Sequence, residues 1–256
     1  MIVPMLLCPG TAYCSRPVTE TLVFIPAWNE AQNLPAVLRE LYEELPDVDV
    51  LVVDDGSTDG TADAARGGGA EVTSFGENRG LRAAIAAGYA YARDHDYAFC
   101  SRIDADGQHP AHELRRLLER VHADACDVAV GSRFVSDDTH AAHRYTPTPE
   151  RALGTAALRR LMELRLERPM GDATSGLYAV NAKAIPLLAE PYTSGAPEVE
   201  GLIRIVEAGL RLDEVPVDMR ERASGESKLR GVVSVKLVAT LLLAVFTGWK
   251  FWRRRV

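Results

Sequence analysis

The stretch SRIDADGQHP, residues 101–110, places two carboxylates and an amide at the end of a predicted strand. The residues just upstream, 97–103, are rich in aromatic and apolar side chains, which is typical of a buried strand. At a strand end, residues two apart point the same way, so Asp104 and Asp106 can converge, with Gln108 beyond them. Oxygen ligands of this kind suit Mg²⁺ or Mn²⁺ held jointly with the phosphates of a substrate. The same residues also make a good turn, and the rest of the chain has to decide between these interpretations.

Strand and helix patterns alternate on both sides of this stretch. The predicted strands are the apolar runs at 21–25, 48–53, 70–74, 127–130, 177–180 and 210–217. The predicted helices lie at 30–44, 60–66, 78–93, 110–122, 150–167 and 197–208. We expect Asn29 to cap the first of these helices. The alternation predicts an α/β fold built on a parallel sheet, which binds ligands at the carboxyl ends of its strands.

Polar turns at 54–59 and 104–108 fall at the carboxyl ends of predicted strands. The chain contains neither the G-x-G-x-x-G of a dinucleotide fold nor the G-x-x-x-x-G-K-[ST] of a P-loop. In a nucleotide-binding sheet of this kind, phosphate charge would therefore be met by a metal ion and by Arg or Lys side chains. This favours the interpretation of Asp104 and Asp106 as metal ligands.

Length and composition indicate one α/β domain with appendages. The chain has 256 residues, of which 47% are apolar, enough for a large core. We expect an N-terminal extension at 1–20, the main domain at 21–230 and a C-terminal segment at 231–256. The net charge of -7 argues against a nucleic-acid partner. The four cysteines show no metal spacing, so we expect free thiols in a reducing compartment.

The C-terminal segment is basic and apolar. From Lys228 to the end there are seven Lys or Arg residues and no Asp or Glu, which leaves 22 basic against 36 acidic residues before it. The apolar run between Lys236 and Lys250 would span about 20 Å as a helix, short of the roughly 30 Å hydrocarbon core. Trp249 and Trp252 beside three arginines resemble an interfacial anchor. We expect a peripheral helix on the cytoplasmic leaflet, the inner face of the membrane. The alternatives are a spanning helix, packing on the body, and a homodimer interface.

Seven strings, in order, resemble family 2 inverting glycosyltransferases of GT-A fold. The later strings are similar to the polyprenyl-phosphate mannosyl- and glucosyltransferase branch. The strings cover about residues 21–230 and are PAWNE (26–30), VDDGSTD (53–59), NRG (78–80) with Gly88, DADGQHP (104–110), GSRF (131–134), DATSG (172–176), and EVPV (214–217) with R-x-x-G-x-S-K (222–228).

The resemblance implies roles for individual residues. Pro26, Ala27, Glu30 and Asp55 would line the base and ribose pocket of a nucleotide sugar, and Gly80 would belong to the same donor site. Asp104, Asp106 and Gln108 would hold Mg²⁺ or Mn²⁺ against the diphosphate. Arg133, Arg222 and Lys228 would lie near the phosphates. Arg82 departs from the branch, which usually has a small residue there, so the pocket can differ in size or charge.

The implied chemistry breaks an anomeric C–O bond and leaves a nucleotide diphosphate with extra negative charge. A divalent ion acts as a Lewis acid for this leaving group, which makes Asp106 and Arg133 catalytic candidates. A lipid phosphate is already an anion and needs no strong base, whereas a hydroxyl acceptor does. Asp172 and Glu198 are the candidate bases, although each can equally be a helix cap or a surface carboxylate.

Two other pairs have alternative interpretations. Asp54 and Asp55 could form an acid–base dyad, but the sequence is equally that of a capped turn. His109 and His112 resemble a zinc pair, but without a third ligand at metal spacing we expect surface histidines at a helix start.

The sequence therefore predicts metal-dependent, inverting transfer of a hexose from a nucleotide sugar, GDP-mannose or UDP-glucose, to a polyprenyl phosphate. One alternative is the same donor chemistry onto a hydroxyl of a glycan or a small natural product. An alternative of another class is a protein that binds sugar nucleotides, or assembles the cell envelope, without turnover.

Overall fold

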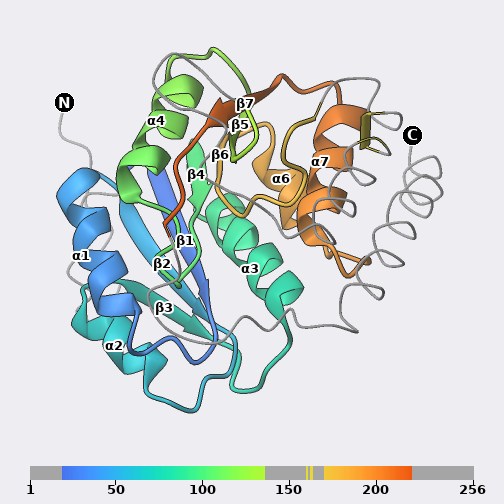
Figure 1. Ribbon diagram of the computed structural model, residues 1–256. Helices are drawn as coiled ribbons and strands as arrows, with labels where there is room; N and C mark the ends of the chain where they lie inside the picture. Colours follow the sequence, from blue (N-terminus) through green and yellow to red (C-terminus); the bar gives the residue numbers. More distant parts are fainter. Residues whose placement is uncertain (1–18, 136–159, 161, 164–169, 221–256) are drawn as a thin grey trace, which may run out of the picture.

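The computed structural model describes residues 19–135, 160, 162–163 and 170–220. In this part of the chain, helices cover both faces of a seven-stranded sheet with the order β3-β2-β1-β4-β6-β5-β7 (Figure 1). The strands are β1 (Thr21–Ala27), β2 (Asp49–Asp54), β3 (Glu71–Ser74), β4 (Phe99–Arg102), β5 (Val128–Ser132), β6 (Tyr178–Asn181) and β7 (Leu212–Pro216). The helices are α1 (Leu34–Glu44), α2 (Thr61–Gly67), α3 (Leu81–Asp94), α4 (Ala111–His122), α6 (Ile185–Ala189) and α7 (Pro197–Glu207).

The sheet is mixed, which corrects the expectation of a parallel sheet. β1 pairs in parallel with β2 and β4, and β5 pairs in parallel with β7. β6 lies between β4 and β5 and runs antiparallel to both. Alternation of strand and helix predicts that two strands run parallel only where a helical crossover joins strands that are neighbours in the sheet. β4 and β5 are joined by α4 but are separated in space by β6, so the sequence pattern does not give the direction of β6.

Each face of the sheet is covered by its own apolar core. Along β1, Leu22 and Phe24 belong to the core beneath α3, α6 and α7, whereas Val23 and Ile25 belong to the core beneath α1, α2 and α4. Successive side chains of a strand point to opposite faces, so a strand covered on both faces is apolar throughout. This explains why β1 appears in the sequence as an unbroken apolar run.

The beginnings of two helices differ from the predictions. α1 begins at Leu34 rather than at residue 30, and Asn29 does not cap it. Asn29 has a left-handed backbone conformation (φ 55°), and its side-chain oxygen accepts a hydrogen bond from the amide of Thr58 instead. α3 begins at Leu81 rather than at 78, because Gly80 (φ 87°) interrupts the helical conformation just before it.

Several predictions concern residues outside the described part of the chain. They are the extension at 1–18, most of the helix at 150–167 and the C-terminal segment at 231–256. Cys100 and Cys126 are buried free thiols, as expected, while Cys8 and Cys14 are outside the described residues.

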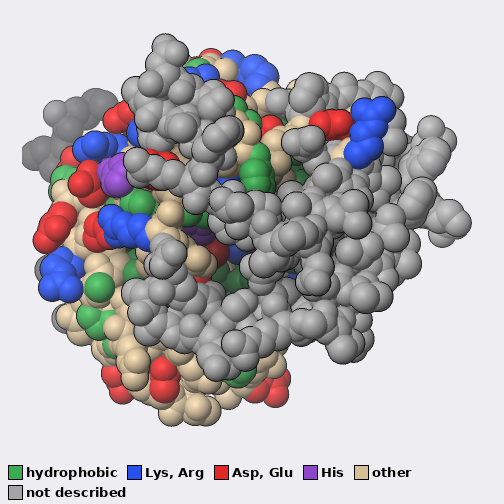
Figure 2. Space-filling view, viewed as in Figure 1, with side chains coloured by type: hydrophobic (Ala, Val, Ile, Leu, Met, Phe, Trp, Pro, Cys, Tyr) green, Lys and Arg blue, Asp and Glu red, His purple; other side chains and the backbone are tan. Residues whose placement is uncertain are grey.

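Among the helices of the described residues, none has the length and apolar character needed to cross a membrane. Acidic and basic side chains are interspersed on the described surface that faces the viewer in Figure 2.

Gly88 lets α3 approach β1 closely, and this contact gives a stability prediction. A methyl group at position 88 would lie 2.2 to 2.5 Å from ring atoms of Phe24, so one of the two elements would have to move. We expect Gly88→Ala to lower the free energy of unfolding by about 2 kcal/mol, the usual cost of overpacking a core. Urea unfolding followed by circular dichroism measures the loss. Gly67→Ala is the matched control, because a methyl group there meets nothing within 4 Å. Equal losses in both variants would contradict the close contact.

Asp127, which is 3% exposed and precedes β5, connects the ends of β6 and β7 at the far edge of the sheet. Its carboxylate accepts hydrogen bonds from Arg211, from Asn181 at the end of β6 and from Lys183. These contacts, above all those with Arg211, lower the pKa of Asp127 far below its usual 3.8. The carboxylate therefore remains charged in the folded state at a pH where it is protonated in the unfolded chain.

The depressed pKa predicts how stability depends on pH. Asp127→Asn should cost about 2 kcal/mol at pH 7, the value typical of hydrogen bonds to a charged group. The stabilisation by Asp127 is fully present above its unfolded pKa and is lost as the pH falls toward the folded one. The difference between wild type and variant should therefore narrow below about pH 4. Urea midpoints measured from pH 7 to pH 3 check this, and a difference that stays constant over that range would contradict it.

Candidate active site

The ends of β1 and β2 form one side of the predicted donor site. The backbone amide of Asp55 donates to the carbonyl of Ala27, the last residue of β1. Beyond them, the loops at 28–31 and 57–61 are tied together, since the amide of Asn29 donates to Ser57 and that of Glu30 donates to Thr61. Pro26 and Ala27 thus end β1, Asp55 directly follows β2, and Glu30 lies in the loop beyond β1; their contact with a base and ribose stays a prediction.

Asp54 and Asp55 are both hydrogen-bonded to loop groups, an arrangement that matches the capped turn. Asp54 accepts from the Ser57 amide and the Ser74 hydroxyl, and although burial opposes the shift, these bonds lower its pKa. Asp55 is 3% exposed and accepts from the amides of Arg79 (2.6 Å) and Gly80 (2.9 Å). The backbone of Gly80 is therefore anchored by Asp55, next to the predicted donor site.

The acidic turn follows β4 at the same edge of the sheet. Asp106 is 7% exposed, and one of its oxygens accepts the backbone amide of Gln108. The Asp104 side chain is more open, with 33% of its surface exposed. The carbonyl of Gln108 accepts from the amide of Arg220, which also forms a bidentate ion pair with Glu40 of α1. Arg220 therefore lies directly beside the acidic turn.

Arg102, the last residue of β4, is a buried cation that the sequence analysis missed. Its guanidinium donates to Asp104 (3.1 Å) and to Glu198 at the start of α7 (3.0 Å). The Arg102 side chain is 4% exposed and that of Glu198 is 17% exposed. Its position within the predicted strand at 97–103 was the available signal. A charged residue in a buried strand is rarely without a partner, so an ion pair could have been expected. Glu198 is therefore an ion-pair partner rather than a surface carboxylate.

His109 is buried beside the acidic turn, which corrects the expectation of two surface histidines. His112 has 46% of its side chain exposed, but His109 has 6%, and its Nδ1 lies 4.0 Å from Asp104 Oδ2. That nitrogen has no hydrogen-bond partner among the described residues. Burial lowers the pKa of His109, the charges of Asp104 and Asp106 oppose the shift, and the positive charges of Arg102 and Arg133 add to it. The buried ring of His109 therefore lies beside the Asp104 carboxylate.

Arg133 follows β5 and is held by the turn before β6. Asp172, with 1% of its side chain exposed, accepts from the Arg133 guanidinium through both oxygens, at 2.6 and 2.8 Å. Thr174 accepts a further bond from Arg133 at 2.9 Å. Glu214 of β7 fixes the turn in its place by accepting the backbone amides of Gly171 and Asp172. The sequence strings contained Glu214 but assigned no role to it.

Gly176 brings the Asp172–Gly176 turn against the acidic turn. A methyl group at position 176 would lie 2.5 Å from Asp104 Oδ2 and 3.2 Å from Arg102 Nη2. A side chain at position 176 would displace the Asp104 carboxylate, so glycine allows this carboxylate to lie against the backbone. Asp104, Arg102 and Gly176 are therefore in direct contact, although they come from segments more than seventy residues apart.

The donor set of the acidic turn fits a hard divalent cation. It offers carboxylate oxygens, the ligands that Mg²⁺ and Mn²⁺ prefer. In the described part of the chain, no three His, Cys, Asp or Glu side chains gather as a set that could hold a metal. A metal at Asp104 and Asp106 would therefore draw further ligands from a bound diphosphate and from water. Arg222 and Lys228, the other predicted phosphate contacts, lie outside the described residues.

Comparison with known proteins identifies the same family as the seven sequence strings do. The model of glycosyl transferase family 2 matches residues 22–176. A polyprenol monophosphomannose synthase of Mycolicibacterium smegmatis is 35% identical over 84% of this chain and 83% of its own. An undecaprenyl-phosphate mannosyltransferase of Micrococcus luteus is 33% identical over 92% of this chain and 98% of its own.

A solved structure supports the fold assignment. Glucosyl-3-phosphoglycerate synthase from Mycobacterium tuberculosis, crystallised with Mn²⁺, UDP and phosphoglyceric acid, superposes with a TM-score of 0.67. The superposition covers 90% of this chain and 79% of the other, at 21% identity. The family match extends over more than half of the chain, from β1 to the turn that holds Arg133. The chain therefore belongs to glycosyl transferase family 2 and is a glycosyltransferase of GT-A fold.

Proposed function

We propose that the protein transfers a hexose, with inversion, from a nucleotide sugar to a polyprenyl phosphate, and that the transfer depends on Mg²⁺ or Mn²⁺. The observation that carries the choice of acceptor is that both candidate bases are held in ion pairs. Asp172 is bound through both oxygens to Arg133, and Glu198 is bound to Arg102. A phosphate acceptor needs no strong base, whereas a hydroxyl acceptor does.

The donor would bind along the joined ends of β1 and β2. Pro26, Ala27 and Glu30 would face the base and ribose, and Asp55 would hold the Gly80 loop that closes this side. The hydrogen bonds from Asn29 and Glu30 to the loop at 57–61 support a preformed pocket. Preorganised polar groups bind a ligand with a smaller entropic cost than mobile ones.

The diphosphate would lie at the acidic turn. Asp104, Asp106 and Gln108 would hold the divalent ion, which as a Lewis acid stabilises the charge that develops on the leaving nucleotide. Arg133 would add charge-assisted hydrogen bonds, and Asp172 and Glu214 would keep its guanidinium in place before the substrate arrives. Arg222 and Lys228 follow Arg220 along the chain and would complete the cationic side of the site.

The names of the relatives and the C-terminal sequence support the lipid acceptor. Both relatives described above are named for mannosyl transfer to polyprenyl phosphates. The basic, apolar segment at 231–256 has the composition of an interfacial anchor, which would bring the site to a lipid substrate at the inner face of the membrane. The relatives favour mannose as the sugar, and hence GDP-mannose over UDP-glucose as the donor.

A transfer assay tests this proposal with the full chain and radiolabelled GDP-mannose or UDP-glucose. Label should extract into organic solvent when polyprenyl phosphate and Mn²⁺ or Mg²⁺ are both present, and should stay in water when EDTA replaces the metal. Asp106→Asn should lower the rate by about 100-fold or more, because a transition-state contact to the leaving group is lost. Asp63→Asn is the matched control, since Asp63 is an exposed carboxylate on α2.

Three results would contradict parts of the proposal. Donor turnover that does not depend on the lipid would indicate a hydroxyl acceptor, and no turnover with either donor would favour a binding protein. A near-wild-type rate for Asp106→Asn would remove the metal role from the acidic turn.

A further inference from the structure

Arg102 lies between the acidic turn and α7 and shares its charge between two carboxylates. Its Nη2 donates to Asp104 and its Nη1 donates to Glu198, while its buried Nε has no hydrogen-bond partner among the described residues. Burial opposes the charged form, but Asp104 and Glu198 outweigh it and raise the pKa of Arg102. The side chain is therefore a permanent cation within contact distance of a proposed metal ligand.

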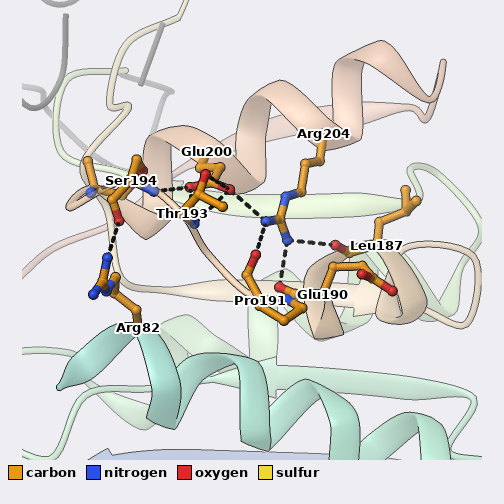
Figure 3. A network of polar contacts seen from close by, with 9 residues as sticks. Arg82, Leu187, Glu190, Pro191, Thr193, Ser194, Glu200 and Arg204 are labelled. Carbon is orange, nitrogen blue, oxygen red and sulfur yellow. Dashed lines mark hydrogen bonds and ion pairs between the residues drawn. The ribbon is translucent and has the colours of Figure 1, made fainter. Parts of the chain in front are cut away.

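Glu198 is held in place by the way α7 begins. Figure 3 shows the network that locks the segment before this helix. Glu200 accepts the amides of Thr193 and Ser194, and Arg204 donates to Glu200 and to the carbonyls of Leu187, Glu190 and Pro191. These hydrogen bonds hold the first turn of α7 in place, and Glu198 in that turn contacts Arg102 at the end of β4.

The surroundings of the Arg102–Glu198 pair strengthen its electrostatic effect. A small cavity beside the pair is lined by Tyr89, Tyr178 and Tyr192 as well as by the two charged side chains. All three tyrosines are at least nine-tenths buried, so little water screens the charges. Charges interact more strongly in such a site than at an exposed surface.

We infer that Glu198 sets the affinity of the Asp104–Asp106 turn for a divalent cation by neutralising Arg102. When Asp104 turns its charge toward a metal, Arg102 keeps Glu198 as its counter-ion. Without Glu198, the full charge of Arg102 would be directed at Asp104 and would compete with the metal. Glu198 is thus a positioning residue that acts through Arg102, and the inference rests on the metal role proposed for Asp104.

Binding of Mn²⁺ to the full chain, in the presence of GDP or UDP, tests the inference without relying on turnover. Electron paramagnetic resonance measures the free Mn²⁺ in each titration. Glu198→Gln should raise the dissociation constant of Mn²⁺ by about tenfold, as changes next to metal ligands commonly do. Glu198→Asp keeps the charge and should remain within about threefold of wild type, at the limit of ordinary context dependence. Glu190→Gln, which removes an exposed carboxylate at the end of α6, should leave the constant unchanged.

A double-mutant cycle shows whether Glu198 acts through Arg102. In an Arg102→Met background there is no cation left to neutralise, so adding Glu198→Gln should not weaken Mn²⁺ binding further. Thermal unfolding of every variant is recorded alongside. A lower melting temperature with an unchanged dissociation constant in Glu198→Gln would overturn the inference and leave the pair a purely structural one. An equal loss in both backgrounds would also overturn it.

The same titrations separate this inference from the proposed function. If wild type binds no Mn²⁺ with either nucleotide, or Asp106→Asn binds it equally well, the metal role of the acidic turn fails and the inference fails with it. If wild type binds Mn²⁺, Asp106→Asn does not and Glu198→Gln matches wild type, only the inference about Glu198 is overturned.

Discussion

Negative charge gathered at one edge of the sheet is the constraint on which the site depends. Carboxylates from β2, the acidic turn after β4, β7, α7 and the turn before β6 lie at or near this edge, where a diphosphate would add more. Two buried carboxylates are paired, Asp55 with backbone amides and Asp172 with Arg133, and the partly buried Glu198 is paired with Arg102. Burying a carboxylate without such partners would cost several kcal/mol. Charge pairing therefore determines which residues surround the acidic turn.

The pairs also join the two halves of the domain. The first half, β1 to β5 with Arg133, carries the joined loops after β1 and β2 and the acidic turn, while the second half carries Asp172, Glu198 and Glu214. Contacts from the second half reach back to Arg102, Asp104 and Arg133. Because β6 is inserted between β4 and β5, the turn before it lies against both strand ends. The antiparallel strand β6 therefore affects the site as well as the topology, because it places the turn before it at the ends of β4 and β5.

The sequence predicted the positions of the elements better than the contacts between them. Apolar runs and polar turns located the seven strands of the described residues and their helices apart from α6, because covered strands and strand-end turns have local signatures. The direction of β6, the burial of His109 and the ion pairs of Arg102 depend on contacts between distant segments, which no local pattern contains. Asn29 shows the same limit, since a residue typical of helix caps is used here to bind the neighbouring loop. Glu214 lay within a matched string, yet its contact with the turn at 171–172 becomes visible in three dimensions.

The proposed role of Asp104 and Asp106 is to hold a divalent ion against the diphosphate of the donor. The most direct measurement is a crystal structure of the full chain with GDP or UDP and Mn²⁺, with the metal located by its anomalous scattering. We expect one anomalous peak within coordination distance of Asp104, Asp106 and the diphosphate oxygens, with Arg133 on the phosphate side. A bound nucleotide whose phosphates lie away from the acidic turn, or a metal peak bound to other residues, would contradict it.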